Sequence, residues 1–211
     1  MSILRRVSAV VPDADVLREA AAVLTAGGIV AYPTDTFYGL AVDPRDGNAV
    51  RRLFVAKGRA SEAAVPLIAA DADQVEALLG ELSAMARRLA EALWPGPLTL
   101  VIAAGPGLAP ELLAGGGTVA VRVPAHAVAV GLARAAGHPI TSTSANRSGE
   151  RPAREAAEVV AAMGDRVALV LDAGVCAGGL PSTVVDVTAG VPRLVRTGAV
   201  PWNRVLRSLE A

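Results

Sequence analysis

Several cationic side chains stand where predicted helices or strands end, and together they could bind a small polyanion. They are Lys57, Arg59, Arg122 and Arg196, each beside small or hydroxyl residues. Lys57, in the segment VAKGRAS, is the only lysine of the chain. A compact ammonium and forked guanidinium groups both suit phosphate oxygens. This set therefore favours a ligand such as a nucleotide triphosphate.

Hydroxyl side chains gather in the segment PITSTSAN, which predicts a strand running into a polar loop. A period of two places Ser142 and Ser144 on one face and Thr141 and Thr143 on the other. Because buried hydroxyls need hydrogen-bond partners, the segment favours a polar cleft. A Ser/Thr-rich turn whose side chains satisfy one another is the alternative.

The segment TVAVRVP predicts a strand with its valines on one face and Thr118 and Arg122 on the other. At about 3.3 Å per residue these two side chains stand roughly 13 Å apart, so they could bracket a small ligand. An edge strand with an exposed arginine is an equally good interpretation.

The segment YPTDTFYG follows a predicted strand and places Thr34 and Thr36 on one side, with Asp35 opposite. Capping of a helix by Asp35 or Thr36 is the structural alternative to a binding role. Ser182 begins one later strand and Arg196 ends another. Open α/β sheets commonly bind ligands at such strand ends.

Several classes of chemistry are excluded by missing motifs. The chain has no P-loop, no dinucleotide-binding glycine fingerprint and no nucleophile elbow. One cysteine and two histidines exclude an internal disulfide framework and a zinc cluster. We expect Cys176 to be inert and His126 and His138 to be structural. The chemistry must then depend on positioning and charge stabilisation, as in transfers at phosphorus.

The composition is 53% hydrophobic and 19% charged, with 20 cationic and 20 anionic side chains. Zero net charge and few aromatic residues argue against a dedicated nucleic-acid surface. No apolar run approaches the roughly 20 residues that span a bilayer, and no apolar stretch follows the N-terminal arginines. We expect a cytoplasmic protein without membrane contact.

Helical and strand periods alternate from end to end, which predicts one interwoven α/β unit. Helices are expected over residues 13–27, 48–58, 71–79, 82–93, 124–137 and 154–164, with a short one starting at Pro201. Strands are expected over residues 28–33, 65–70, 97–103, 118–124, 139–146, 167–174, 182–187 and 193–198. Residues 105–117, GPGLAPELLAGGG, are the most loop-like segment and are expected to be mobile.

Six motifs occur together in the order and spacing of one family: YPTDTFYGL, AKGR, WPGPLTLV, TVAVRVP, TSTSANRSG, and STVVDV followed by RLVRTG. On these motifs the chain resembles the YrdC-like family, which includes the threonylcarbamoyl-AMP synthases, over roughly residues 15–200. The resemblance implies an α/β fold with a twisted, mostly open mixed sheet flanked by helices. It also implies a single domain over residues 1–211, without the additional C-terminal domain of longer relatives.

The resemblance further implies a nucleotidyltransferase that combines L-threonine, bicarbonate or CO2, and ATP into threonylcarbamoyl-AMP and releases pyrophosphate. A partner threonylcarbamoyl transferase complex would then modify an adenosine of certain tRNAs, and a weak RNA contact is compatible with this role. Mg2+ would enter with ATP, without direct protein ligands.

Residue by residue, the resemblance assigns two sets of contacts. Threonine would be bound by Thr36, Arg122, Ser142 and Ser182. ATP would be bound by Arg59, Thr118, Ser144 and Arg196, with Lys57 close to the phosphates and both Lys57 and Arg59 acting in catalysis. The chain departs from the family where an Asn and a His commonly help to hold substrate, because Ala63 and Ile68 stand there. We expect residues 105–117 to close the site.

Two other functions fit the same residues. A paralogue of the same fold could bind nucleotide and RNA, in ribosome maturation or translation, without making this product. A carbamoyl-transfer module of a larger enzyme is the third hypothesis, and the absence of zinc-finger cysteines disfavours it.

Overall fold

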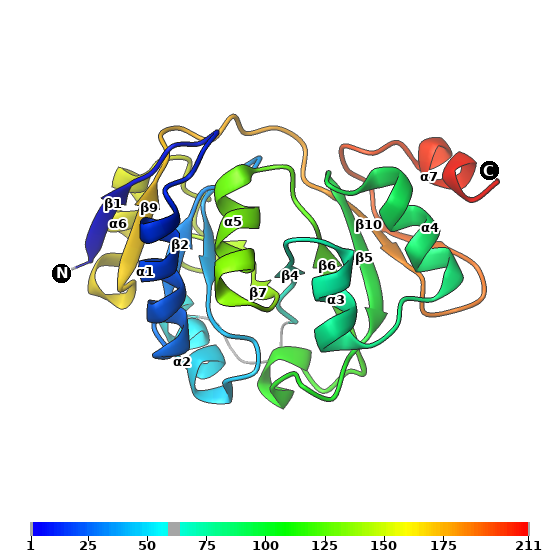
Figure 1. Ribbon diagram of the computed structural model, residues 1–211, viewed down its shortest axis with the longest axis horizontal. Helices are drawn as coiled ribbons and strands as arrows, with labels where there is room; N and C mark the ends of the chain where they lie inside the picture. The colour runs from blue at the N-terminus through cyan, green and yellow to red at the C-terminus, as the bar shows by residue number, and fades with distance from the viewer. Residues whose placement is uncertain (1, 59–63, 211) are drawn as a thin grey trace.

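The computed structural model describes residues 2–58 and 64–210, which form an α/β unit with helices around two open mixed sheets (Figure 1). The expected fold class is confirmed, but the strands are divided between two sheets instead of one. The five-stranded sheet has the order β1 (Ile3–Arg6), β9 (Leu169–Asp172), β2 (Val30–Tyr32), β3 (Gly39–Ala41) and β8 (Thr143–Ser144). The six-stranded sheet has the order β11 (Arg193–Arg196), β10 (Thr183–Asp186), β5 (Leu98–Ala103), β6 (Thr118–Arg122), β4 (Leu67–Ile68) and β7 (Ile140–Thr141).

Strands β1 and β3 have no counterpart among the strands expected from the sequence. They are four and three residues long, which is too short for an alternating pattern to stand out. Each is positioned by its neighbours, because β1 pairs in parallel with β9, and β3 pairs antiparallel with β2 and β8.

The helices agree with the expected ranges to within a few residues. They are α1 (Ala14–Thr25), α2 (Gly47–Lys57), α3 (Ala72–Leu79), α4 (Ala84–Leu93), α5 (Ala127–Ala136), α6 (Ala156–Met163) and α7 (Trp202–Glu210), with short 3-10 turns η1 (Pro110–Leu113) and η2 (Gly164–Arg166). Within residues 2–58 and 64–210, no helix has both the length and the apolar character needed to span a bilayer.

Local capping explains where several helices begin and end. The Asp13 carboxylate accepts hydrogen bonds from the first amides of α1, the usual role of an aspartate at this position. Helix α2 ends at Gly58, whose φ of 61° is left-handed and therefore favours glycine. The His126 Nδ1 atom accepts the Val128 N–H at 3.3 Å and caps α5, so this histidine is structural, as predicted.

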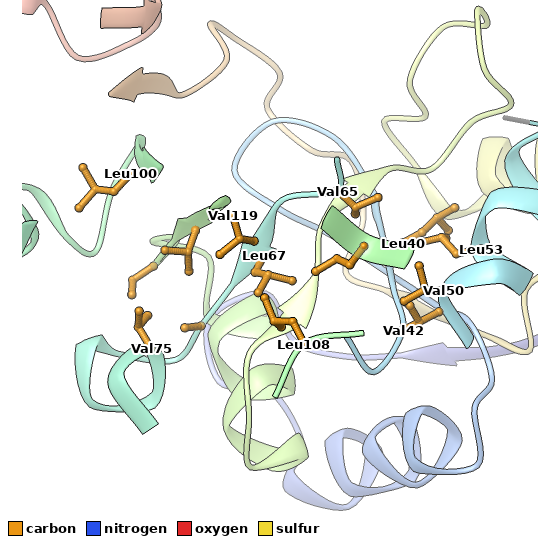
Figure 2. Packing of buried hydrophobic residues seen from close by; sticks show 14 of the residues in the cluster. Leu40, Val42, Val50, Leu53, Val65, Leu67, Val75, Leu100, Leu108 and Val119 are labelled. Atoms are coloured by element: carbon orange, nitrogen blue, oxygen red, sulfur yellow. The ribbon is translucent and has the colours of Figure 1, made fainter. Parts of the chain in front are cut away.

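The core forms on both faces of the five-stranded sheet, because alternate residues of a strand point in opposite directions. Val30 and Tyr32 pack in the hydrophobic cluster that includes residues of α1 and α5. Leu40 lies in the other cluster, beside Leu53 of α2 (Figure 2).

Residues 105–117 are not the unstructured loop that their composition predicts. Pro110–Leu113 form η1, and Leu108, Ala109 and Leu112 are buried in the main core. The Val65 N–H donates to the Leu112 carbonyl at 3.4 Å. Apolar side chains between the glycines therefore supply enough buried surface to hold the segment against the core.

The two sheets meet where the expected strand 139–146 is divided. Strand β7 pairs with β4, and β8 pairs with β3. Between them, the Ser142 N–H donates to the Pro66 carbonyl at 2.7 Å. The predicted alternation is confirmed, because Thr141 and Thr143 are buried while Ser142 and Ser144 are half-buried.

Asp43 gives the fold a testable dependence on pH. Its carboxylate accepts hydrogen bonds from Arg45 at 2.9 and 2.7 Å and lies 3.5 Å from His138 Nε2. Burial raises the pKa of Asp43, but the Arg45 side chain and backbone and the charge of His138 lower it by more, so the pKa lies below its ordinary value. The ionised carboxylate therefore stabilises the folded state above the unfolded pKa of about 3.9, and this contribution is lost as the pH falls through the lowered folded pKa.

We expect Asp43→Asn to reduce the free energy of unfolding by about 1–2 kcal/mol at pH 7, since Arg45 is partly exposed. Urea unfolding of both proteins at a series of pH values checks this. The difference between the free energies of unfolding of the wild-type protein and the variant should become smaller below about pH 4. A difference that stays constant down to the lowest pH would contradict the role of the Asp43 charge.

Candidate functional site

A cavity of about 290 Å³ is lined by residues of both sheets. This volume is near the lower end of the range usual for small-molecule sites. Six residues that the sequence singled out line it: Thr36, Arg122, Ser142, Ser144, Ser182 and Arg196. The other lining residues are Pro66, Leu67, Ile68, Thr99, Thr143 and Pro181. Hydroxyls and guanidinium groups from distant parts of the chain therefore converge as predicted.

Arg122 is the buried cation of the cavity, with a side chain only 12% exposed. Burial lowers its pKa, the charges of Asp35 and Tyr32 raise it, and the second guanidinium of Arg196 lowers it. An arginine nonetheless stays protonated in a protein. Its Nη1 atom lies 3.3 Å from Asp35 Oδ2, longer than the roughly 2.7–2.9 Å of a strong charge-assisted bond. The guanidinium can therefore bind a further anion.

Ser182 contacts both Arg196 and Thr99, and it thereby connects β11 to β5 at the cavity. The exposed Arg196 donates to the Ser182 carbonyl at 3.2 and 2.9 Å and to its hydroxyl at 3.1 Å. The Thr99 and Ser182 hydroxyls share a hydrogen bond of 2.7 Å. Thr99 is buried and was not singled out from the sequence. Its signal was a lone hydroxyl in the apolar strand LTLVIA, on the face opposite Leu98 and Leu100.

Tyr32 is hydrogen-bonded to the segment that carries Ser142, a residue of the cavity lining. Its hydroxyl is fully buried, donates to the Thr141 carbonyl at 3.2 Å and is hydrogen-bonded to the Ser142 side chain. Burial raises the pKa of Tyr32, so the phenol stays neutral and can donate. A Cβ atom at Gly39 would lie 3.1 Å from the Tyr32 ring. A larger residue at this position of the motif YPTDTFYGL would therefore require the Tyr32 ring to shift by a few tenths of an ångström.

The turn after β2 does not cap a helix, so that interpretation of Asp35 and Thr36 is wrong. β3 follows the turn, and the Thr34 hydroxyl closes it. This hydroxyl donates to the Phe37 carbonyl at 2.6 Å and accepts the Thr36 and Phe37 N–H groups at 3.3 Å. The turn presents Thr36 to the cavity.

Lys57 lies at the end of α2, is not among the residues that line the cavity, and is only 4% exposed. Its Nζ atom donates to the carbonyls of Ser144 and Asn146 at 2.5 and 2.9 Å. The Ser148 N–H in turn donates to the Lys57 carbonyl at 2.9 Å. The lone lysine therefore ties the end of α2 to β8, which contains Ser144, and to the segment that follows β8.

One further predicted residue, Thr118, is not among those that line the cavity. Thr118 is exposed at the start of β6 and pairs with Ala103, whereas Arg122 at the other end pairs with Ile68. Its contact with ATP remains a prediction. Arg59 lies outside the described residues, as does Ala63.

The remaining reactive side chains show no activated state. Burial raises the pKa of the Cys176 thiol, so little thiolate forms. Burial lowers the pKa of His126, so this side chain also favours its neutral form. His138 is buried and contacts the Pro139 carbonyl and Asp43. These surroundings agree with the inert and structural roles expected from the sequence.

No group of three or more His, Cys, Asp or Glu side chains within the described ranges could hold a metal ion. The residues that line the cavity include no carboxylate, and carboxylates are the ligands Mg2+ takes from proteins. The lining thus does not fit a directly ligated Mg2+.

Three larger surface hollows, of about 800, 680 and 470 Å³, lie elsewhere. The second is lined by Arg51 and Arg52, but these are already paired with Glu111 and Asp46. None of the three combines a largely buried cation with several hydroxyls as the smaller cavity does, so we assign the site to the smaller cavity.

Fold and site together define an α/β protein with a cavity between two open mixed sheets, whose guanidinium and hydroxyl groups suit a small anionic ligand. A family model named for Sua5, YciO and YrdC, and described as "Telomere recombination", matches residues 22–198. The chain belongs to this family, which confirms the resemblance found in its motifs.

Two relatives are similar to this chain in sequence over most of its length. The chain is 38% identical over 190 residues to a threonylcarbamoyl-AMP synthase of Pyrococcus abyssi, covering 90% of this chain and 56% of that protein. It is 39% identical over 186 residues to a putative threonylcarbamoyl-AMP synthase of Mycobacterium tuberculosis, covering 88% and 85% respectively. The chain therefore spans little more than half the length of the first of these relatives.

Two solved structures have the same fold as this chain. The P. abyssi Sua5 structure complexed with L-threonine superposes with a TM-score of 0.89 at 35% identity, covering 99% of this chain and 61% of that one. E. coli YciO superposes with a TM-score of 0.85 at 26% identity, covering 97% of this chain and all of that one.

Proposed function

We propose that this protein is a threonylcarbamoyl-AMP synthase of the cytoplasm. It would combine L-threonine, bicarbonate or CO2, and ATP, release pyrophosphate, and pass its product to a transferase that acts on tRNA. The observation that carries the proposal is the convergence of Arg122 with Thr36, Ser142 and Ser182 in one cavity. The names of the relatives, and the L-threonine held by the P. abyssi structure, support it.

In this proposal the cavity first positions the amino acid. The Arg122 fork binds the carboxylate, because a planar guanidinium matches two carboxylate oxygens. Thr36, Ser142 and Ser182 surround the amine and the side-chain hydroxyl. Hydrogen bonds made for that hydroxyl would reject analogues that lack it.

The chemistry then needs an N–C and an O–P bond to form, and two N–H bonds and one P–O bond to break. The substrate ammonium first gives a proton to solvent, the neutral amine attacks CO2 and releases a second proton to solvent, and a carbamate oxygen attacks the α-phosphorus of ATP. The bond from that phosphorus to the bridging oxygen breaks, and pyrophosphate leaves. Arg196 and Ser144 would bind phosphate oxygens at the cavity mouth, and positioning of this kind is the main source of catalysis in such transfers. Mg2+ would arrive as the ion of MgATP and is treated as part of that substrate.

Pyrophosphate release by the purified protein tests the proposal directly. With MgATP and bicarbonate, release should require L-threonine, and L-serine should support it poorly. Release that does not respond to threonine, despite ATP binding, would contradict the synthase. Salt-dependent RNA binding together with that result would favour the nucleotide-binding and RNA-binding paralogue.

Thr99→Val tests how the Ser182 hydroxyl is positioned. The substitution keeps the shape of the side chain and removes one hydrogen bond, worth about 0.5–1.5 kcal/mol. Because 1.4 kcal/mol corresponds to about tenfold in affinity, we expect the threonine KM to rise roughly three- to tenfold. The ATP KM should be unchanged. Steady-state kinetics measure both, and Thr99→Ser should restore the wild-type value. A loss in the Ser variant with none in the Val variant would show that packing, and not the hydroxyl, matters.

A further inference from the structure

We infer that Asp35 binds the ammonium group of the amino-acid substrate, so that Asp35 and Arg122 recognise a zwitterion as a charged pair. The inference rests on the proposed function and adds a binding residue to it. Asp35 stands in the motif YPTDTFYGL, but neither the motif nor the lining of the cavity gives it a role.

The geometry of the pair matches a zwitterion. Asp35 Oδ2 lies 3.3 Å from Arg122 Nη1, with the carboxylate side chain 29% exposed at the edge of the cavity. In an α-amino acid the nitrogen and the nearer carboxylate oxygen are about 3 Å apart, from standard bond lengths. A bound amino acid can therefore place its carboxylate on Arg122 and its ammonium on Asp35 at the same time.

The turn that carries Asp35 is held in place before any ligand binds. Thr34 is buried, and its hydroxyl makes three hydrogen bonds across the turn. Such preorganisation reduces the entropy lost on binding. Asp35 is thus a fixed charge beside the cavity and not a side chain that must be recruited.

The positive charges around the cavity would repel a substrate ammonium unless a carboxylate such as Asp35 lies next to it. The lining carries two guanidinium groups, Arg122 and Arg196, whose mutual repulsion contributes to lowering the pKa of Arg122. An ammonium entering such a site is repelled unless an anion stands next to it. His126 and Cys176 also lie near Asp35, but burial lowers the pKa of the histidine and raises the pKa of the thiol, so neither adds a charge at neutral pH. The Asp35 carboxylate contacts Arg122.

Three ligands separate this role from a merely structural one. L-Threonine carries both charges, L-threoninol keeps the ammonium without the carboxylate, and (R)-3-hydroxybutyrate keeps the carboxylate without the ammonium. Their affinities are measured by calorimetry for the wild-type protein and for Asp35→Asn, which preserves shape. We expect threonine and threoninol to bind roughly ten- to a hundredfold more weakly to the variant, the effect of losing a charged hydrogen-bond partner, and 3-hydroxybutyrate to bind equally well to both.

Two results would overturn the inference. Parallel losses for threonine and 3-hydroxybutyrate, with threoninol unaffected, would mean that Asp35 only holds Arg122. Tighter threonine binding by the variant would mean that Asp35 competes with the substrate for Arg122. Asp73→Asn, an exposed position on α3, is the matched control and should change none of the affinities.

The inference and the proposed function can fail separately. Threonine-dependent pyrophosphate release by the wild-type protein, combined with either overturning result, would remove the inference alone. A wild-type protein that neither binds threonine nor releases pyrophosphate in response to it would remove both.

Discussion

Arg122→Ala is expected to raise the threonine KM of the proposed synthase by about two to four orders of magnitude. The guanidinium would make two charge-assisted hydrogen bonds to the substrate carboxylate, each worth about 1.5–3 kcal/mol, and every 1.4 kcal/mol is tenfold in affinity. The effect should be this large because the group is only 12% exposed, so water replaces it poorly. Steady-state kinetics of pyrophosphate release, with threonine varied at saturating MgATP, measure it.

Arg122→Lys is the informative control for this prediction. Lysine keeps the charge but not the planar fork, so its KM should fall between those of the wild-type and alanine proteins. The ATP KM should stay near the wild-type value in both variants, and urea unfolding should show that both are folded. An unchanged threonine KM in Arg122→Ala would disprove the carboxylate contact.

Lys57→Met is expected to affect both stability and activity strongly. The substitution removes the ammonium that donates to the carbonyls of Ser144 and Asn146, and it leaves those buried oxygens without that donor. With about 1.5–3 kcal/mol for each bond to a charged group, and some compensation by water, we expect a loss of roughly 2–5 kcal/mol in the free energy of unfolding. Pyrophosphate release should fall below a hundredth of the wild-type rate, because Ser144 would no longer be held at the cavity.

Measuring both quantities separates two roles for Lys57. If the lysine acts only on ATP phosphates, activity should disappear while the free energy of unfolding remains that of the wild-type protein. If it acts as a tether, the two should fall together. Val55→Ala is a suitable control on the same helix, because that side chain is 79% exposed and its truncation should change neither.

The motif residues illustrate how far local patterns reach. Alternation along β6 correctly separated the buried valines from Arg122, and alternation in residues 139–146 correctly placed Ser142 and Ser144 together. Such predictions succeed because side-chain direction in a strand depends only on near neighbours. The same reasoning predicted the helices, whose apolar spacing and capping residues lie within a few positions of one another.

Local patterns failed where a contact joins distant segments. Composition marked residues 105–117 as a loop, but Leu108 and Leu112 bury against other elements and hold the segment in the core. The predicted single strand at 139–146 divides at Ser142, because its two halves find partners in different sheets. No short-range period carries that information.

The fold class, the approximate helix ranges, the faces of the longer strands and the family could be predicted from the sequence, as could half of the residues that line the cavity. Packing between distant elements is what divides the strands between two sheets and brings Lys57 to two carbonyls, Thr99 to Ser182 and Asp35 to Arg122. The Lys57–Ser144 and Asp35–Arg122 contacts each join residues 87 positions apart. They exist because the packing of whole elements brings those side chains together, and local residue spacing reports nothing about that packing.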